Sequence, residues 1–410
     1  MSALPHCTAL LNMLALYKYR IIIIFVLVVI FDLTIGNCFV GLMNDDSKWK
    51  MYEDGYLNCS QILEVNESDP VICGASSGKQ LSYSAGKFKN GVIGLCNVGV
   101  RSGLNSLLQT FYMNQNFSEV LCGIEESNDN VPLKRRLPYE LLALFEEMQN
   151  SKEDAVAPYR ILACLRVANQ TLLNLYDVGE LFFKIWNLLL QQMSHPYLED
   201  KLRTLYMINW EETFTCQKCS HQRTSVQNVL TISLNVCHSK HHRNLTLQNC
   251  LRRFFKPKEV FAESNGACPK CGENSTSVKG IRLVSLPHTL NIHLKRLSPK
   301  KSTLKTNRIL SFPDILDLSE VLDPEYLPSE GQDQGRYDYE LFAVIAHSGT
   351  ATSGYFCTYI KSWKDHKWYC FNDSSVCPVS WDDVKCAYGN TSFHWGVTAC
   401  LLVYIQSDVE

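Results

Sequence analysis

Residues 94–106 read GLCNVGVRSGLNS, and ordered structure is expected to begin just before this stretch, around Gly91. The preceding residues are polar and mixed, with scattered Gly, Ser and Asn, which indicates an irregular arm over 1–90. The following residues predict a helix over 104–114, because Leu104, Leu107 and Phe111 recur at helical spacing. The stretch therefore lies where an irregular arm gives way to a helical region.

Further along the chain, predicted helices precede predicted strands. Helices are expected over 138–148, which begins with Pro, and over 172–192, which is dense in Leu, Phe and Trp. After residue 205 the pattern favours strands, over 226–236, 281–297, 340–347, 368–371 and 399–405. Helices first and strands second indicate an α+β protein rather than alternating βαβ units.

The composition is that of a globular protein with room for a large core. Of 410 residues, 46% are apolar and 20% are charged. The net charge of −2 gives no electrostatic reason to expect nucleic acid as a partner. The 18 cysteines are compatible with a disulfide-rich secreted protein or with thiols plus a metal site. Because dense disulfides are typical of small domains that lack a core, the second interpretation is favoured.

The first forty residues contain an unbroken apolar run, IIIIFVLVVIF, over 21–31. This run is shorter than the roughly 20 residues of a membrane span. It fits the core of a signal peptide, with Thr34 and Gly36 as cleavage flanks. A leader with translation starting at Met43 or Met51 is the alternative. Membrane association through this run stays open, and the remainder of the chain is expected to be cytoplasmic.

Two pairs of cysteines have the spacing of a metal site. Cys216 and Cys219 form one C-x2-C turn, and Cys268 and Cys271 form another. Four thiolates satisfy Zn²⁺ tetrahedrally and leave no open position, so the predicted zinc is structural. Two disulfides or four unrelated thiols are the alternatives.

Several stretches resemble the ubiquitin-specific proteases. Residues 94–106 resemble the cysteine box of that family, GLxNxGxTCxxNS. Three segments resemble the histidine box of the family: 339–349 (YELFAVIAHSG), 353–359 (SGYFCTY) and 368–373 (WYCFND). Two others resemble further family segments: 286–296 (LPHTLNIHLKR) and 312–317 (FPDILD). The resemblance covers about 91–406. It is strongest to a member that is induced by interferon and removes a ubiquitin-like modifier.

The resemblance implies a papain-like cysteine protease hand. A helical thumb would occupy 91–190, zinc-tipped β fingers 205–290, and a β palm the remainder. In this family the fingers grip ubiquitin or a ubiquitin-like protein, and the C-terminal tail of that protein runs between thumb and palm. The resemblance therefore also implies the partner and the thiol-dependent hydrolysis of isopeptide bonds.

The resemblance assigns the reacting positions residue by residue. Asn97 corresponds to the oxyanion donor, and Asn372, with Asp373 beside it, corresponds to the residue that orients the base. The nucleophile position is occupied by Ser102 instead of Cys, and the base position by Tyr355 instead of His. A serine hydroxyl is far harder to ionise than a thiol, and a phenol with a pKa of about 10 is a feeble base. These two replacements predict loss of hydrolysis.

Other residues could in principle replace the missing groups. Cys96 precedes Ser102 in the cysteine box, but is expected to be a small buried thiol. His347 is an imidazole eight positions before Tyr355, a position where the family often has a second histidine. His293 is expected to be a packing or surface residue.

The thumb segment 175–182 (LYDVGELF) aligns with the family box QQDAHEFL. Asp177 and Glu180 are retained, and such carboxylates suit the arginine-rich tail of a ubiquitin-like protein. The paired glutamines are replaced by Leu175 and Tyr176, which weakens this assignment. The alternative for Asp177 is a helix-capping carboxylate.

Three functional hypotheses follow. The first is an inactive pseudo-deubiquitinase that binds ubiquitin, a ubiquitin-like modifier or a signalling protein. The second is an active cysteine-type deubiquitinase that uses an unrecognised thiol. The third is a membrane-tethered or lumenal glycoprotein that reuses the fold, for which the Asn-x-Ser/Thr triplets are the sequence support: Asn58, Asn66, Asn116, Asn169, Asn244, Asn274, Asn372 and Asn390.

Overall fold

A computed structural model of the chain describes residues 92–99, 102–124, 136–168, 177–193, 195–236, 245–261, 268–272, 276–297, 305–328, 337–351, 353–389 and 396–407. These residues belong to the second of the two units into which the chain divides, Met1–Ala75 and Ser76–Glu410. The arm expected over 1–90, with its apolar run over 21–31, lies outside the described residues. Among the described residues, no helix has the length and apolar character that crossing a membrane requires.

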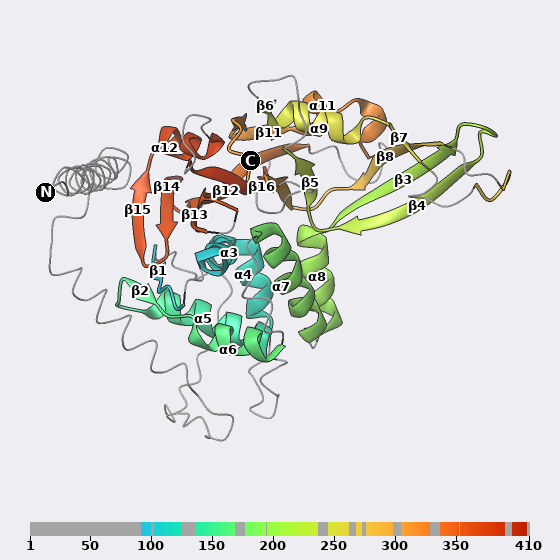
Figure 1. Cartoon of the computed structure of the whole chain (residues 1–410). Coiled ribbons are helices and arrows are strands. Elements are labelled where there is room, and N and C mark those ends of the chain that lie inside the picture. Colours follow the sequence, from blue (N-terminus) through green and yellow to red (C-terminus); the bar gives the residue numbers. More distant parts are fainter. Residues whose placement is uncertain are drawn as a thin grey trace, which may run out of the picture. The chain divides into compact units, whose positions relative to one another are not determined.

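The first part of the fold is helical (Figure 1). Its helices are α3 (Ser102–Met113), α4 (Gln115–Cys122), α5 (Leu137–Asn150), α6 (Tyr159–Ala168), α7 (Val178–Gln192) and α8 (Pro196–Tyr206). Asn114 separates α3 from α4, because its side chain caps α4 by accepting a hydrogen bond from the N–H of Phe117 at 3.2 Å. The helices predicted over 104–114 and 138–148 are confirmed as α3 and α5. The described part of the helix predicted over 172–192 is α7.

The second part is an 8-stranded sheet, called the palm sheet below. Its strands follow the order β15-β14-β13-β12-β16-β9-β5, and β11 pairs with β12. They are β5 (Ile232–Asn235), β9 (Thr289–Lys295), β11 (Ile315–Asp317), β12 (Asp338–Gly349), β13 (Gly354–Lys361), β14 (Trp368–Asn372), β15 (Ser375–Val379) and β16 (Thr398–Gln406). The strands predicted over 340–347, 368–371 and 399–405 are confirmed as β12, β14 and β16.

The palm sheet is buried on both faces. Successive side chains of β12 point to opposite faces, so this strand contributes to two cores. Ala343 and Ile345 pack with the helical part, whereas Val344 and Ala346 pack in a second core on the other face. The second core includes residues of α9 (Leu247–Phe255), α11 (Leu318–Val321) and α12 (Trp381–Lys385). A helical layer against a mainly antiparallel sheet, in which β5 pairs in parallel with β9, confirms the α+β class.

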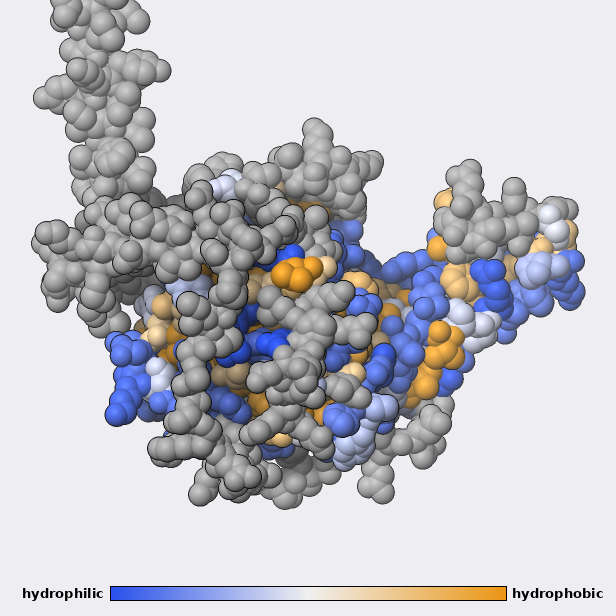
Figure 2. Space-filling view, turned by 90° about the horizontal axis from the view of Figure 1, so that it is seen from below, coloured by the Kyte–Doolittle hydropathy of each residue, from blue (hydrophilic) through white to orange (hydrophobic). Residues whose placement is uncertain are grey.

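A second sheet, with 4 strands in the order β4-β3-β8-β7, forms the fingers, which extend away from the palm sheet in Figure 1. Its strands are β3 (Ile208–Cys216), β4 (Gln222–Val229), β7 (Lys258–Val260) and β8 (Ser277–Ser285). On β3, burial is confined to Ile208 and Trp210 at one end and Cys216 at the other. Apolar and hydrophilic residues are interspersed along this arm in Figure 2. The described part of the far end therefore has no apolar core of its own.

Two predicted strands prove to be two strands each. The run over 226–236 contains β4 and β5, and the run over 281–297 contains β8 and β9. In both cases the chain passes from the fingers into the palm sheet. Pro287 lies between β8 and β9, where its missing N–H cannot continue a ladder. An alternating pattern shows that a segment is extended but not which sheet it joins.

The remaining short elements are β1 (Gly94–Leu95), β2 (Ala155–Val156), β6 (Leu245–Thr246), β10 (Leu310–Ser311), and the 3-10 turns η3 (Pro324–Tyr326) and η4 (Cys386–Tyr388).

Candidate functional site

The expected nucleophile and base positions come together where α3 meets β13. Ser102 is the first residue of α3 and is 5% exposed. Its Oγ accepts a hydrogen bond from the backbone N–H of Phe356 at 3.0 Å. Phe356 follows Tyr355, whose side chain is 42% exposed. The phenyl ring of Phe356 lies against α3, since a Cβ added at Gly103 would be 3.3 Å from it. The serine hydroxyl is thus held by a backbone group of the strand that carries Tyr355.

Asp373 ties together three segments of this site. It lies in the turn between β14 and β15, with a left-handed φ of 51°. Its backbone carbonyl accepts a hydrogen bond from the N–H of Leu95 at 2.9 Å. Its carboxylate accepts hydrogen bonds from Nδ2 of Asn97 at 2.7 Å and from Nδ2 of Asn105 at 2.8 Å. Burial raises the pKa of Asp373, and the hydrogen bonds from Asn105 and Asn97 oppose this without cancelling it.

The expected oxyanion donor and the expected orienting residue are both near this turn. One N–H of the Asn97 amide is occupied by Asp373. Asn372 is the last residue of β14 and pairs with Ser375 across the hairpin. Asn105 did not emerge from the sequence, although it belongs to the quoted box. Two signals were available: the family box has Asn at this position, and an Asn on the buried face of a predicted helix needs a polar partner.

His347 lies on β12 and is paired with Phe356 on β13. Its ring centroid is 4.6 Å from that of Phe356. Burial, together with the charge of Lys305, lowers the pKa of His347 to about 4. Lys305 Nζ donates to the carbonyl oxygens of His347 at 2.9 Å and Gly349 at 3.2 Å. Within the described residues, no hydrogen bond joins the His347 ring to Ser102, and Cys96 packs against the first core.

Asp177 caps the N-terminus of α7. Its Oδ1 accepts hydrogen bonds from the N–H groups of Gly179 at 2.8 Å and Glu180 at 3.0 Å. The same oxygen lies 3.0 Å from Nε2 of His293. Burial disfavours the ionised carboxylate, but the hydrogen bond and charge of His293 and the two backbone N–H groups outweigh it, so the pKa of Asp177 is lowered. Glu180 is more exposed and pairs with Lys184 at 2.9 Å.

The partnership of Asp177 with His293 links the thumb to the palm sheet. His293 is on β9 and is 7% exposed. A Cβ added at Gly179 would lie 2.6 Å from three atoms of the His293 ring, so the first turn of α7 approaches the imidazole as closely as glycine allows. From the sequence, His293 was expected to be a packing or surface residue, because no local pattern connects β9 with α7.

Two cavities lie between parts of the fold. A narrow one of about 30 Å³ is lined by residues of both thumb and palm, including Asp177, His347, Lys305 and Phe356. A larger one of about 720 Å³ lies among α8, the base of the fingers and β16, and its lining includes Arg203, Asn209, Ser285, His288 and Gln406. The larger cavity is therefore bounded by all three parts of the fold.

The four finger cysteines converge. The sulfur atoms of Cys216, Cys219, Cys268 and Cys271 all lie within 4.8 Å of one another. The sulfur atoms are 4.0 Å apart between Cys216 and Cys271, and 3.6 Å apart between Cys219 and Cys268. A Zn–S bond of about 2.3 Å in a tetrahedron places sulfurs about 3.8 Å apart. The spacing of the four sulfurs thus fits Zn²⁺.

The two cysteine turns have the same backbone shape. The N–H of Ser220 donates to the carbonyl of Cys216 at 2.9 Å, and the N–H of Gly272 donates to the carbonyl of Cys268 at 2.8 Å. Ser220 and Gly272 each follow the second cysteine of a turn and have φ of 53° and 69°. Each turn directs its two thiols to one side, so the two turns together supply the four sulfurs of the cluster. A metal bound here would join β3 to the segment preceding β8, where the fingers have little apolar burial.

The chain is similar in sequence to known proteins. A family described as "Ubiquitin carboxyl-terminal hydrolase" matches residues 93–404. The chain is similar to Ubl carboxyl-terminal hydrolase 18 of Homo sapiens, with 38% identity over 322 residues that cover 78% of this chain and 87% of that protein. It is 40% identical to the Mus musculus protein of the same name over 325 residues, covering 79% and 88%. Ubiquitin carboxyl-terminal hydrolase 47 of Homo sapiens is 26% identical over 392 residues, which cover 80% of this chain and 28% of that protein.

The match includes the helical part, the palm sheet and the fingers, which are the regions that the cysteine-box and histidine-box resemblance covered. Because it extends over most of the chain, the chain belongs to the ubiquitin carboxyl-terminal hydrolase family.

Proposed function

We propose that this chain is a pseudo-deubiquitinase, which binds ubiquitin, a ubiquitin-like protein or a signalling partner without hydrolysing it. The observation that carries the proposal is at α3. Ser102 stands at the nucleophile position with its Oγ bonded to the Phe356 N–H, and Tyr355 stands at the base position. Neither a thiol nor an imidazole occupies the pair of positions that the family uses.

Hydrolysis through a side-chain nucleophile needs a base that removes the proton of that nucleophile. A cysteine thiol has a pKa of about 8.5, whereas a serine hydroxyl depends wholly on its neighbour. A tyrosine with a pKa of about 10 is a neutral phenol at pH 7 and offers no effective base. In a serine protease, loss of the nucleophile–base unit lowers turnover on the order of 10⁶-fold. We expect a deficit of that order relative to a family member with both groups intact.

His347 is a poor replacement base. A general base works best when its pKa lies near the working pH. The pKa of His347 is lowered to about 4, first by burial and then by Lys305. Its ring packs against Phe356, and within the described residues it makes no hydrogen bond to Ser102. These properties support the inactive interpretation over an active cysteine or serine peptidase.

The binding half of the proposal is supported by the retained architecture. The cavity of about 720 Å³ is bounded by thumb, fingers and palm, the three parts that hold ubiquitin in the family. Asp177 is engaged by its helix cap and by His293, so the more exposed Glu180 is the better candidate for an arginine-rich tail. Two of the relatives reported above are named for Ubl and for ubiquitin, which agrees with a ubiquitin-fold partner. We further propose structural Zn²⁺ in the fingers.

We also propose a cytoplasmic location. No disulfide joins the cysteines of the described part of the chain, which suits a reducing compartment. The link to the interferon response stays a prediction from the resemblance. The lumenal alternative predicts a glycosidase-sensitive mass when the full chain is expressed in animal cells.

The test measures binding and turnover on the same protein. The full chain is titrated with ubiquitin and with ubiquitin-like proteins by calorimetry, and incubated with their C-terminal fluorogenic amides. We expect binding of at least one such protein and no turnover above background. The double variant Ser102→Cys, Tyr355→His should gain turnover, and Tyr355→His alone, its matched control, should not. Turnover by the unmodified chain that thiol alkylation abolishes would overturn the inactive assignment. Failure to bind any of these proteins would overturn the assignment of a ubiquitin or ubiquitin-like partner.

A further inference from the structure

Three cysteines outside the site lie on neighbouring strands at the edge of the palm sheet. Cys357 is on β13, Cys370 on β14 and Cys377 on β15, which is the outermost strand. Cys357 and Cys370 are 1% and 3% exposed, whereas Cys377 is partly exposed. All three contact the second core, so they share one face of the sheet. A partly accessible thiol therefore stands next to buried ones.

Cys370 and Cys377 are direct partners in the β14–β15 ladder. Opposed residues of an antiparallel pair have Cα atoms about 4.5 or 5.5 Å apart. Both values fall within the range of about 4.4–6.8 Å that a disulfide spans. Their Cβ atoms are about 4.5–5.5 Å apart, wider than the disulfide mean of about 3.8 Å. Oxidation would therefore draw the edge strand toward β14, and a bond formed under such strain is readily reduced.

The two thiols also differ in acidity. A hydrogen bond from Cys370 lowers the pKa of Cys377 to about 7, although burial and the charge of Asp383 oppose it. The contacts of Cys370 with Cys357 and Cys377, and then its burial, raise the pKa of Cys370. Of the two thiols, Cys377 therefore ionises first, and Cys370 keeps its proton. An accessible thiolate beside a second thiol is the arrangement of cysteines that react with peroxides.

We propose that Cys377 and Cys370 form a thiol-oxidation site whose substrate is a hydroperoxide. The Cys377 thiolate attacks the terminal peroxide oxygen, the O–O bond breaks, and the alkoxide or hydroxide that leaves takes a proton from water. The sulfur of Cys370 then attacks the sulfenic acid of Cys377. The S–S bond forms and the S–O bond breaks, and the departing hydroxyl leaves as water with the Cys370 proton. Two thiols are oxidised by two electrons, the peroxide is reduced, and a dithiol reverses the reaction.

This pair encloses the turn that organises the candidate site. Cys370 lies two residues before Asn372, and Cys377 lies two residues after Ser375, the two ends of the hairpin. Asp373, which receives hydrogen bonds from Asn97 and Asn105, is in the turn between them. A disulfide would close the hairpin immediately behind that turn. The inference is independent of whether the chain hydrolyses or binds a ubiquitin-like protein.

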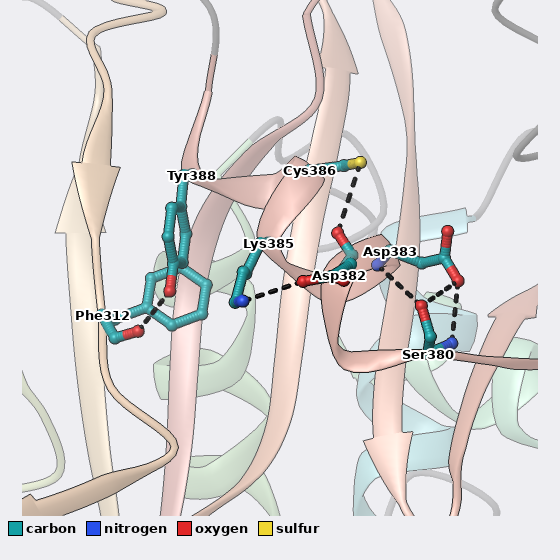
Figure 3. Close-up of polar contacts among 7 residues, drawn as sticks. All are labelled: Phe312, Ser380, Asp382, Asp383, Lys385, Cys386 and Tyr388. Atoms are coloured by element: carbon teal, nitrogen blue, oxygen red, sulfur yellow. Dashed lines mark hydrogen bonds and ion pairs between the residues drawn. The ribbon is translucent and has the colours of Figure 1, made fainter.

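Cys386 provides a matched internal control. It is exposed, and its Sγ is directed to the carbonyl oxygen of Asp382 at 3.7 Å, within its own helical segment (Figure 3). The segment is held in place by the Ser380–Asp383 capping box and by the hydrogen bond from Tyr388 Oη to the Phe312 carbonyl at 2.7 Å (Figure 3). Cys386 is therefore more accessible than Cys377 but lacks its dithiol arrangement.

The experiment exposes the reduced full chain, in zinc-containing buffer, to hydrogen peroxide for increasing times. Remaining thiols are then alkylated, and tryptic peptides are analysed by mass spectrometry. Residues 368–385 form one tryptic peptide that contains both Cys370 and Cys377, and Cys386 begins the next. We expect peptide 368–385 to lose two hydrogen atoms and both alkylation sites several-fold faster than Cys386 is oxidised. Dithiothreitol should restore both sites.

Two variants sharpen the result. In Cys370→Ser, the sulfenic acid of Cys377 should persist and be trapped by a 1,3-dione, whereas Cys386→Ser should behave as the unmodified chain. Oxidation of Cys386 as fast as that of Cys377, or a Cys357–Cys370 crosslink in place of the intrapeptide bond, would overturn the assignment. If Cys370→Ser does not fold, the comparison of Cys377 with Cys386 in the unmodified chain still decides.

Discussion

Replacing Asp373 separates two contributions to the turn that holds the candidate site. The carboxylate accepts hydrogen bonds from Asn97 and Asn105, and the backbone is left-handed with φ of 51°. Asp373→Gly removes both hydrogen bonds and keeps the backbone unstrained, because glycine tolerates positive φ. Asp373→Ala removes the same bonds and adds strain. Asp373→Asn keeps one acceptor oxygen and tolerates the left-handed backbone.

The magnitudes follow from the partners left behind. An amide donor deprived of its partner costs about 1–3 kcal/mol when it is buried. Asn105 is 2% exposed, but its Nδ2 also donates to the carbonyl oxygen of Cys96 at 3.2 Å, so only one of its two N–H groups loses its partner. Asn97 is half-buried, and water can replace part of its hydrogen bond. Asp373→Gly should therefore destabilise the fold by about 1–3 kcal/mol, and Asp373→Ala by about 1–2 kcal/mol more. Asp373→Asn should be the mildest change.

Thermal unfolding at pH 7, followed by circular dichroism, tests this order. A loss of 1 kcal/mol lowers Tm by about 2–4 °C in domains of 150–250 residues, so Asp373→Gly should lower Tm by several degrees. Asp200→Asn removes an exposed charge from α8 and should leave Tm unchanged. If Asp373→Ala melts at or above Asp373→Gly, the turn does not require a left-handed residue. If Asp373→Gly melts with the unmodified chain, the two hydrogen bonds do not stabilise the fold.

The pH dependence has a definite sign. Burial raises the pKa of Asp373 in the folded state, so folding favours the protonated carboxyl. The stability gained from this protonated form is complete below the ordinary aspartate pKa of about 3.9. That contribution is lost as the pH rises through the raised pKa. Asp373→Asn cannot ionise and escapes this loss. Its stability relative to the unmodified chain should therefore improve as the pH rises across that acidic window.

Three further predictions concern the fingers, the α7 cap and His347. Cys268→Ser, or a zinc chelator, should lower Tm and speed hydrogen exchange at the far end of the fingers, and unchanged melting on chelation would contradict a metal site. Gly179→Ala should destabilise the fold by about 1–3 kcal/mol in urea unfolding, because the new Cβ would lie 2.6 Å from the His293 ring. A gain in stability, as the helix propensity of alanine alone would give, would refute the close approach. Lys305→Met should raise the pKa of His347 from about 4 partway toward its ordinary value, since burial remains. An NMR titration of the ring that shows no change would mean that Lys305 does not contribute.

Local patterns were sufficient for several features. The spacing of apolar residues predicted α3, α5 and the long strands β12, β14 and β16, because each of these elements buries a regular face. The C-x2-C turns predicted four converging sulfurs, because a metal site of this kind is built from two short local turns. The alternative of a capping carboxylate at Asp177 was also available locally, since an N-cap bonds N–H groups two and three residues ahead.

Chemical identity at single positions also needs no coordinates. That residue 102 is Ser and residue 355 is Tyr follows from the sequence, and so does the expectation that this pair cannot ionise and deprotonate as a thiol and an imidazole do. Whether some other group could restore that chemistry does depend on distance. The pKa of His347 is lowered by burial and by Lys305. β13 packs against His347 from across a hairpin, and Lys305 is distant from it in sequence.

The remaining features were decided by tertiary structure. The Asp373 bonds to Asn97 and Asn105, and the His293 bond to Asp177, join segments more than one hundred residues apart, and no period in the sequence encodes such a pairing. The passage of two predicted strands from the fingers into the palm sheet, and the opposition of Cys370 to Cys377, depend on strand partners and register. Register is set when a whole face is buried against its neighbours, so it belongs to the packed fold and not to any one segment.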